Sequence, residues 1–149
     1  MFSRTPRKPV ARSAAVLALL ALPLLASAHT LDVPMGDAAG TTHHLGVICS
    51  NEGGYDSDHL VMNIRNNTPG APLLNAQIIK GPVAVSTTDA VSGDLQPSPS
   101  VRVRGGNGVY NLLVNKTGPG ALVYTLTIHC MEATGQIHTG TDGVVYQYE

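Results

Sequence analysis

Short apolar runs alternate with clusters of Gly, Pro, Asn and Asp along almost the whole chain after residue 28. The clusters recur roughly every ten residues, and no segment shows the period of an amphipathic helix. This spacing is typical of an all-β sandwich or barrel. The predicted strands are residues 42–49, 59–66, 74–80, 83–87, 100–104, 109–116, 122–131 and 144–148.

Side-chain alternation along two of these strands places both cysteines of the chain on apolar faces. Cys130 has the phase of the large apolar residues in 122–131, and Cys49 has the phase of Leu45 and Val47, which leaves His44 outside. One cysteine early and one late in the chain predicts an inter-sheet Cys49–Cys130 disulfide in an immunoglobulin-like, Greek-key β-sandwich of about 7–8 short strands. A thiolate pair that binds a soft metal is the alternative.

Two hallmarks of immunoglobulin domains are missing. The chain contains no tryptophan, and the residue two before Cys130 is Ile128 rather than tyrosine. The expectation therefore concerns the architecture and not membership of the immunoglobulin family.

The first 28 residues have the three regions of a secretory signal peptide. Arg4, Arg7, Lys8 and Arg12 form a basic leader, an apolar run covers 14–25, and 26–28 reads Ala-Ser-Ala. The run is too short for a bilayer core that needs about 20 residues. We expect cleavage after Ala28, a bacterial protein exported to the periplasm or secreted, and one β-sandwich domain over 29–149.

Removal of the leader changes the charge of the chain. Residues 29–149 keep five basic residues against all ten acidic ones, a formal net charge of −5 with neutral histidines. Nucleic acids and anionic membrane surfaces are bound through Lys and Arg, so this balance argues against both. No second apolar stretch approaches membrane-spanning length. We expect a soluble domain whose partner is a metal ion or another protein.

All six histidines of the chain lie after the leader, and His29 becomes the N-terminal residue if cleavage follows Ala28. Its free amine and its imidazole could then chelate one ion, and one further imidazole would complete a T-shaped all-nitrogen Cu(II) site. Candidates for that imidazole are His43 and His44, if the segment 34–41 folds back, and His138, in the loop before the last strand. Copper, as Cu(II), is the expected metal.

The other potential ligands are less suited to one shared ion. His44 and His129 both point outward by alternation, and they would lie on opposite outer surfaces if the cysteines bridge two sheets. Met62 is better explained by core packing, whereas Met131 fits packing and metal binding equally well.

Both ends of the mature chain resemble periplasmic copper carriers of the copper-resistance type. These carriers are small immunoglobulin-like sandwiches that begin with histidine and hold a second histidine in a loop before the last strand. The similar segments here are His29-Thr30-Leu31 with Pro34 and Gly40, and Gly135-Gln136-Ile137-His138 with Gly140. The resemblance covers about twenty residues at the two ends and implies that His29 and His138 are metal ligands; the cysteine pair is a departure from the carriers.

No catalytic motif is visible. The chain lacks a nucleophile elbow, a HExxH zinc motif and a P-loop, so we expect a binding protein rather than an enzyme. Two functions remain open: copper binding through the N-terminal histidine, and a structural or protein-interaction module of the envelope or adhesion type that holds no metal.

Overall fold

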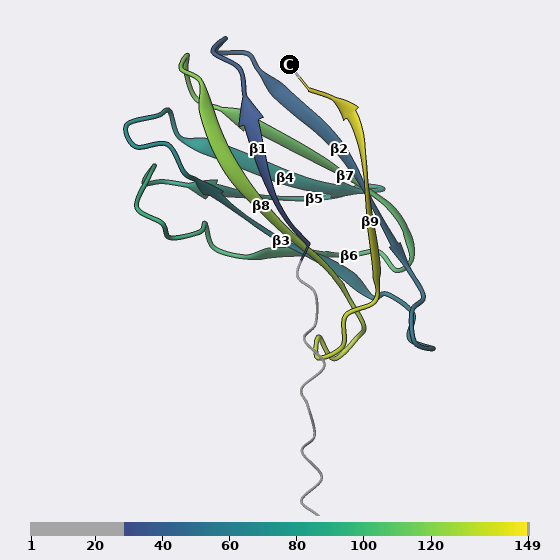
Figure 1. The fold of residues 1–149 in the computed structure, drawn as a ribbon. Helices are drawn as coiled ribbons and strands as arrows, with labels where there is room; N and C mark the ends of the chain where they lie inside the picture. Colours follow the sequence, from purple (N-terminus) through teal and green to yellow (C-terminus); the bar gives the residue numbers. More distant parts are fainter. Residues whose placement is uncertain (1–28, 149) are drawn as a thin grey trace, which may run out of the picture.

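The computed structural model describes residues 29–148, and the predicted signal peptide (1–28) and residue 149 lie outside the described residues. The described chain forms nine β-strands (Figure 1). They are β1 (His29–Met35), β2 (Thr42–Ser50), β3 (His59–Asn66), β4 (Leu74–Lys80), β5 (Val83–Asp89), β6 (Val101–Arg104), β7 (Gly108–Lys116), β8 (Leu122–Met131) and β9 (Gly140–Gln147). Within residues 29–148 there is no helix long and apolar enough to cross a membrane.

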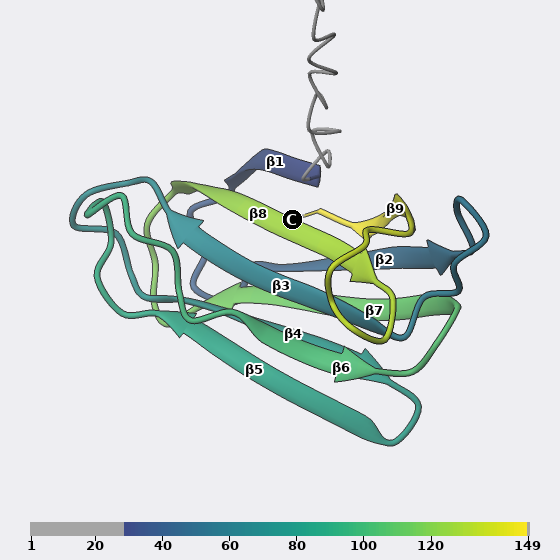
Figure 2. The ribbon, with the colours of Figure 1, turned by 90° about the horizontal axis from the view of Figure 1, so that it is seen from below.

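The strands form two antiparallel sheets that pack face to face (Figure 2). Sheet A has the order β1-β8-β3-β6, and sheet B has the order β5-β4-β7-β2-β9. The predicted all-β, two-sheet architecture is therefore confirmed. β1 ends sheet A and β9 ends sheet B, so each of these strands has one edge without a strand partner in the described chain.

The core consists of the inward residues of both sheets, as alternation predicts. On β8 the buried residues include Tyr124, Leu126 and Cys130, and on β2 they include Leu45 and Val47. The predicted phases are correct on both strands. Two side chains with hydroxyl groups, Tyr110 and Tyr124, are among the largest fully buried ones.

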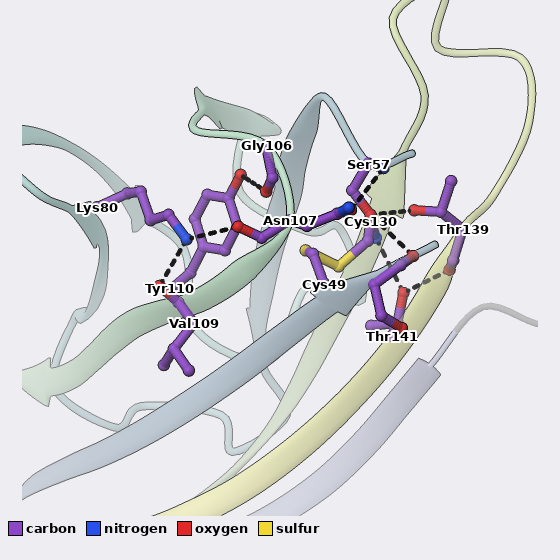
Figure 3. The surroundings of a disulfide bond; sticks show 11 residues. Cys49, Ser57, Lys80, Gly106, Asn107, Val109, Tyr110, Cys130, Thr139 and Thr141 are labelled. Atoms are coloured by element: carbon purple, nitrogen blue, oxygen red, sulfur yellow. Dashed lines mark hydrogen bonds between the residues drawn. A yellow bond between two sulfur atoms is a disulfide. The ribbon is translucent and has the colours of Figure 1, made fainter. Parts of the chain in front are cut away.

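Cys49 on β2 and Cys130 on β8 form a disulfide that links the two sheets (Figure 3). Their Cα atoms are 5.5 Å apart, within the ordinary range for a disulfide. The backbone amide of Cys130 donates to Oγ1 of Thr141 at 3.0 Å, which fixes β8 beside the start of β9. The two cysteines are bonded to each other and are not a thiolate pair for metal.

Strand β1 is the main element that the sequence did not predict. It pairs with β8 from His29 opposite Ile128 to Met35 opposite Leu122, but only Val33 and Met35 are buried in it. Pro34 is compatible with this position because β1 is an edge strand, where a missing amide donor breaks no central ladder. At the other end of the chain, β9 begins four residues earlier than predicted, at Gly140.

Candidate metal-binding site

His29 is the first residue of β1 and the first described residue of the chain. It lies opposite Ile128 in the ladder, so its side chain is on the inner face of sheet A, in phase with Leu31. There it borders an open, mostly apolar groove of about 460 Å³ between β1 and β9, which Val144 and Tyr148 also line. The imidazole of His29 is exposed.

His129 is the next residue along β8 after Ile128, and it points to the outer face of sheet A. The ladder with β1 ends at the pair His29–Ile128, so His129 follows directly after the level at which the main chain enters β1. The α-amine that cleavage after Ala28 would release is the backbone nitrogen of His29, which is at this level of the ladder. The start of β1 thus lies beside a half-buried imidazole.

His138 lies next to His129. It belongs to the loop between β8 and β9 and forms an isolated bridge with Met131, and Thr139 donates its amide to the carbonyl of Cys130 at 2.9 Å. These contacts return the loop onto the outer face of sheet A. As a result, the rings of His129 and His138 have centroids 4.6 Å apart.

The surroundings of His129 favour its neutral form. Burial lowers the pKa of His129 below its ordinary value of 6.5, and the nearby charges of His138 and His29 lower it further. Nδ1 of His129 is buried, and no hydrogen-bond partner for it exists among the described residues. A buried nitrogen without a partner costs about 1–3 kcal/mol, and a neutral imidazole nitrogen is a metal ligand.

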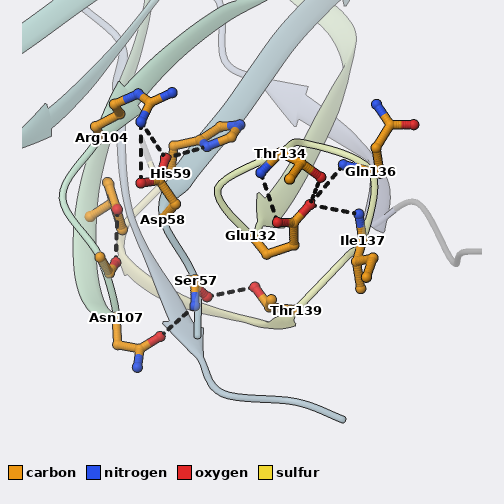
Figure 4. Close-up of polar contacts among 12 residues, drawn as sticks. Ser57, Asp58, His59, Arg104, Asn107, Glu132, Thr134, Gln136, Ile137 and Thr139 are labelled. Atoms are coloured by element: carbon orange, nitrogen blue, oxygen red, sulfur yellow. Dashed lines mark hydrogen bonds and ion pairs between the residues drawn. The ribbon is translucent and has the colours of Figure 1, made fainter. Parts of the chain in front are cut away.

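The loop that carries His138 is organised around the carboxylate of Glu132 (Figure 4). The hydroxyl of Thr134 donates to Oε1 and its amide donates to Oε2 at 2.7 Å, while the amides of Gln136 and Ile137 donate to Oε1 at 3.0 and 3.3 Å. These donors, with the Thr134 hydroxyl first, lower the pKa of Glu132 to about 2. The loop therefore holds its shape through an ionised carboxylate.

His43, a predicted candidate, lies in the interior and not near His29. It is 1% exposed, its Nδ1 lies 2.9 Å from the hydroxyl of Tyr124, and its ring contacts the Tyr148 ring edge-on. β1 and β2 run in opposite directions (Figure 1), so the starts of the two strands are at opposite ends of the sandwich. The segment 34–41 does not fold His43 back onto His29.

His44, the other candidate on β2, lies on the outer face of sheet B. Its Nε2 is 3.1 Å from Oδ1 of Asn111, and its ring packs against Tyr146 of β9. Of the predicted partners of His29, only His138 lies at the same corner of the molecule.

The histidine that the sequence did not select is His129. The outward direction of its side chain was predicted correctly, and so was its separation from His44, which lies on the opposite sheet. The strand that brings His29 beside it was not predicted, although Leu31, Val33 and Met35 alternate with polar residues. The pairing of that strand with β8 was absent from the pattern.

The three imidazoles do not form a ready-made site. Among residues 29–148, no group of three or more His, Cys, Asp or Glu side chains is placed to hold a metal ion. What the structure provides is a pair of adjacent imidazoles, His129 and His138, at the end of sheet A where β1 begins.

No family model matches this chain, and neither a curated protein nor a solved structure matches it. The interpretation of the corner formed by His29, His129 and His138 therefore rests on its geometry and chemistry alone.

Proposed function

We propose that the exported protein, after cleavage behind Ala28, binds Cu(II) at the corner formed by His29, His129 and His138. The observation that carries this proposal is the contact between the His129 and His138 rings beside the start of β1, with Nδ1 of His129 buried and unpartnered. The function is binding rather than catalysis, in the periplasm or outside the cell. An immunoglobulin-like Greek key is part of the same proposal, supported by the disulfide between the sheets.

Cleavage after Ala28 would add one donor that the described chain lacks, the free α-amine of His29. Once the peptide bond before His29 is cut, the α-amine of His29 is a strong donor at the start of β1. It then lies at the same end of sheet A as His129. The His29 imidazole now lies on the groove side, but a terminal residue can rotate about its own backbone bonds. Amine and ring nitrogen then chelate together, and His138 and His129 add two further imidazoles, a donor set that suits Cu(II).

The experiment compares two forms of the N-terminus. The processed protein, which begins at His29, is titrated with Cu(II) beside a version with one extra alanine ahead of His29. We expect sub-micromolar binding that the extension weakens by at least a hundredfold, since it converts the amine into an amide. Equal binding by both forms would overturn the proposal.

Single-histidine variants locate the remaining ligands. We expect His138→Gln and His129→Gln to lower Cu(II) affinity at least tenfold each, whereas His44→Gln, on the outer face of sheet B, is the matched control and leaves it unchanged. Mass spectrometry of the exported protein comes first. A mature chain that begins at any residue other than His29 contradicts the proposed chelate.

A protein-interaction module is the second candidate, and the free edge of β9 favours it. Val144, Val145 and Tyr146 are all exposed there, and long apolar edges are pairing sites for a further strand. The occupant we commit to is β9 of a second copy. In an antiparallel pair centred between Val144 and Val145, the charged Asp142 lies opposite the neutral Gln147, so like charges do not meet.

This candidate is tested by the oligomeric state. Light scattering should find a dimer at micromolar concentrations, and Val145→Lys should convert it to a monomer by placing charges at the centre of the edge. A monomeric wild-type protein across the same range excludes the β9 pairing, and it leaves the copper proposal unaffected.

A further inference from the structure

Three residues with soft or borderline donor atoms lie in one row across the outer face of sheet A. His59 on β3 is directly opposite Met131 on β8, and Met131 forms a bridge with His138 in the loop. Directly opposite residues of antiparallel strands point to the same face, with Cβ atoms about 4.5–5.5 Å apart. This face is the outer one, because the neighbours Leu60 and Cys130 are in the core.

The His59 ring is oriented by a carboxylate. Its Nδ1 lies 2.8 Å from Oδ2 of Asp58, and the guanidinium of Arg104 lies 3.2 Å from the same oxygen (Figure 4). Nδ1–H thus donates a hydrogen bond to Asp58, and in the neutral ring this places the lone pair on Nε2. A carboxylate behind a histidine in this way is the usual outer support of a metal-binding imidazole.

Nε2 of His59 has no hydrogen-bond partner among the described residues, although the side chain is only 3% exposed. The ring points from Asp58 toward the β8–β9 loop (Figure 4), where a Cβ on Gly135 would be 3.9 Å from Nε2. A buried imidazole with one nitrogen fixed and the other unused is placed to bind a ligand beneath this loop.

Met131 determines which metal ion the row of three residues prefers. It is 8% exposed but does not belong to the hydrophobic core between the sheets. A thioether is a soft donor that selects Cu(I), and imidazole nitrogens also bind copper. A group of histidine, methionine and histidine is therefore suited to Cu(I), and the half-buried His138 lies at its accessible end.

We propose that His59, Met131 and His138 form a second metal site, beneath the β8–β9 loop, that binds Cu(I). The proposal rests on the proposed copper function and shares His138 with it, but it does not use the amine of His29. The protein would thus hold copper in both oxidation states at one corner, with nitrogen ligands for Cu(II) and the thioether for Cu(I).

The test measures Cu(I) affinity by anaerobic competition with bicinchoninate, with hydroxylamine as the reductant so that the disulfide stays intact. We expect Met131→Leu, which conserves volume, to weaken Cu(I) binding at least tenfold and to leave Cu(II) binding unchanged. The matched control is Met62→Leu, a methionine of the core, and it should change neither. Equal Cu(I) affinity in the two variants would overturn the site.

Two further measurements separate this site from the proposed Cu(II) function. The extra alanine ahead of His29 should abolish tight Cu(II) binding and leave Cu(I) binding intact; loss of both would show that the Cu(I) site depends on the amine and would overturn it. X-ray absorption of the wild-type Cu(I) protein should show sulfur scattering at the metal. A spectrum with nitrogen ligands only contradicts the role of Met131, and this result requires no variant to fold.

Discussion

The rings of His129 and His138 lie against each other, with centroids 4.6 Å apart and ring planes at 49°. One ring comes from a strand that is held in place by a disulfide at the next residue, Cys130, and the other comes from a loop shaped by Glu132. Burial first, and then the neighbouring ring of His138, disfavour the imidazolium form of His129 and lower its pKa. The contact therefore links the local fold to the proposed metal binding.

The protonation of His129 provides the first prediction. Its pKa should lie below 6.5, because burial and the charges of His138 and His29 disfavour the imidazolium. The unfolded chain then binds more protons than the folded one as the pH falls below about 6.5, so acidification through this range lowers the free energy of unfolding. Ring-nitrogen NMR of the titrating protein measures the pKa.

A substitution of the neighbour tests the cause. His138→Gln should raise the pKa of His129 only in part, since burial is the larger contribution, and His44→Gln should leave it unchanged. A His129 ring that titrates at or above 6.5 in the wild-type protein would contradict the described environment.

The second prediction concerns the β8–β9 loop. Glu132→Gln removes the charge that accepts four hydrogen bonds, so amide exchange at residues 134–137 should increase at least tenfold and copper affinity should fall. Because these bonds lower the pKa of Glu132 to about 2, their stabilisation is complete above the ordinary value of 4.5 and is lost as the pH falls through about 2. The loop should therefore remain protected at pH 4.

The control for the loop is Glu52→Gln, since the Glu52 side chain is exposed and only its backbone pairs with Tyr55. Unchanged exchange at 134–137 in Glu132→Gln would show that the carboxylate does not organise the loop.

The third prediction concerns the disulfide. Replacement of Cys49 and Cys130 by alanine opens a loop with a sequence separation of 81, which in the chain-entropy model lowers the free energy of unfolding by about 4.5 kcal/mol. Urea denaturation followed by tyrosine fluorescence measures the loss. Ile48→Ala, on the outer face beside Cys49, should cost far less, and a similar loss in both variants would contradict the role of the cross-link.

Alternation along the strands contained more information about the histidines than composition did. His43 has the same phase as Leu45, so the pattern already indicated an inward side chain, and the structure shows it buried against Tyr124. His44 has the opposite phase and lies outside. The periodicity that identified the core could therefore have removed His43 from the candidate ligands, where it stood on the condition that the segment 34–41 folds back onto His29.

The neighbours of His29 could not be predicted in the same way. Strand β1 does alternate, with the apolar Leu31, Val33 and Met35 on one face and Thr30 and Asp32 on the other, so the pattern could have identified it as a strand in spite of its proline. Its pairing with β8 could not be found in this way, because it depends on a contact between residues about a hundred positions apart. The row of His59, Met131 and His138 has the same origin, because cross-strand register is set by the whole sheet and not by any one segment.

The last prediction concerns the attachment of β1, which positions His29. The hydroxyl of Thr125 donates to Oδ1 of Asp32 at 2.5 Å, and Thr125 in turn accepts hydrogen bonds from Arg65 of β3 and from Asn67, just after that strand. Residues 29–32 are otherwise exposed, so this polar contact replaces the core packing that the first half of the strand lacks.

Asp32→Ala should therefore loosen the start of β1 without unfolding the sandwich. We expect a loss of about 1–2 kcal/mol, faster amide exchange at residues 30–33 and at least a fivefold lower Cu(II) affinity, because the amine of His29 is no longer held beside His129. Asp32→Asn keeps an acceptor oxygen and should retain most of the affinity. If Asp32→Ala frayed β1 but bound Cu(II) as the wild type does, the strand would not position the metal ligand, and the chelate would act as a free N-terminus.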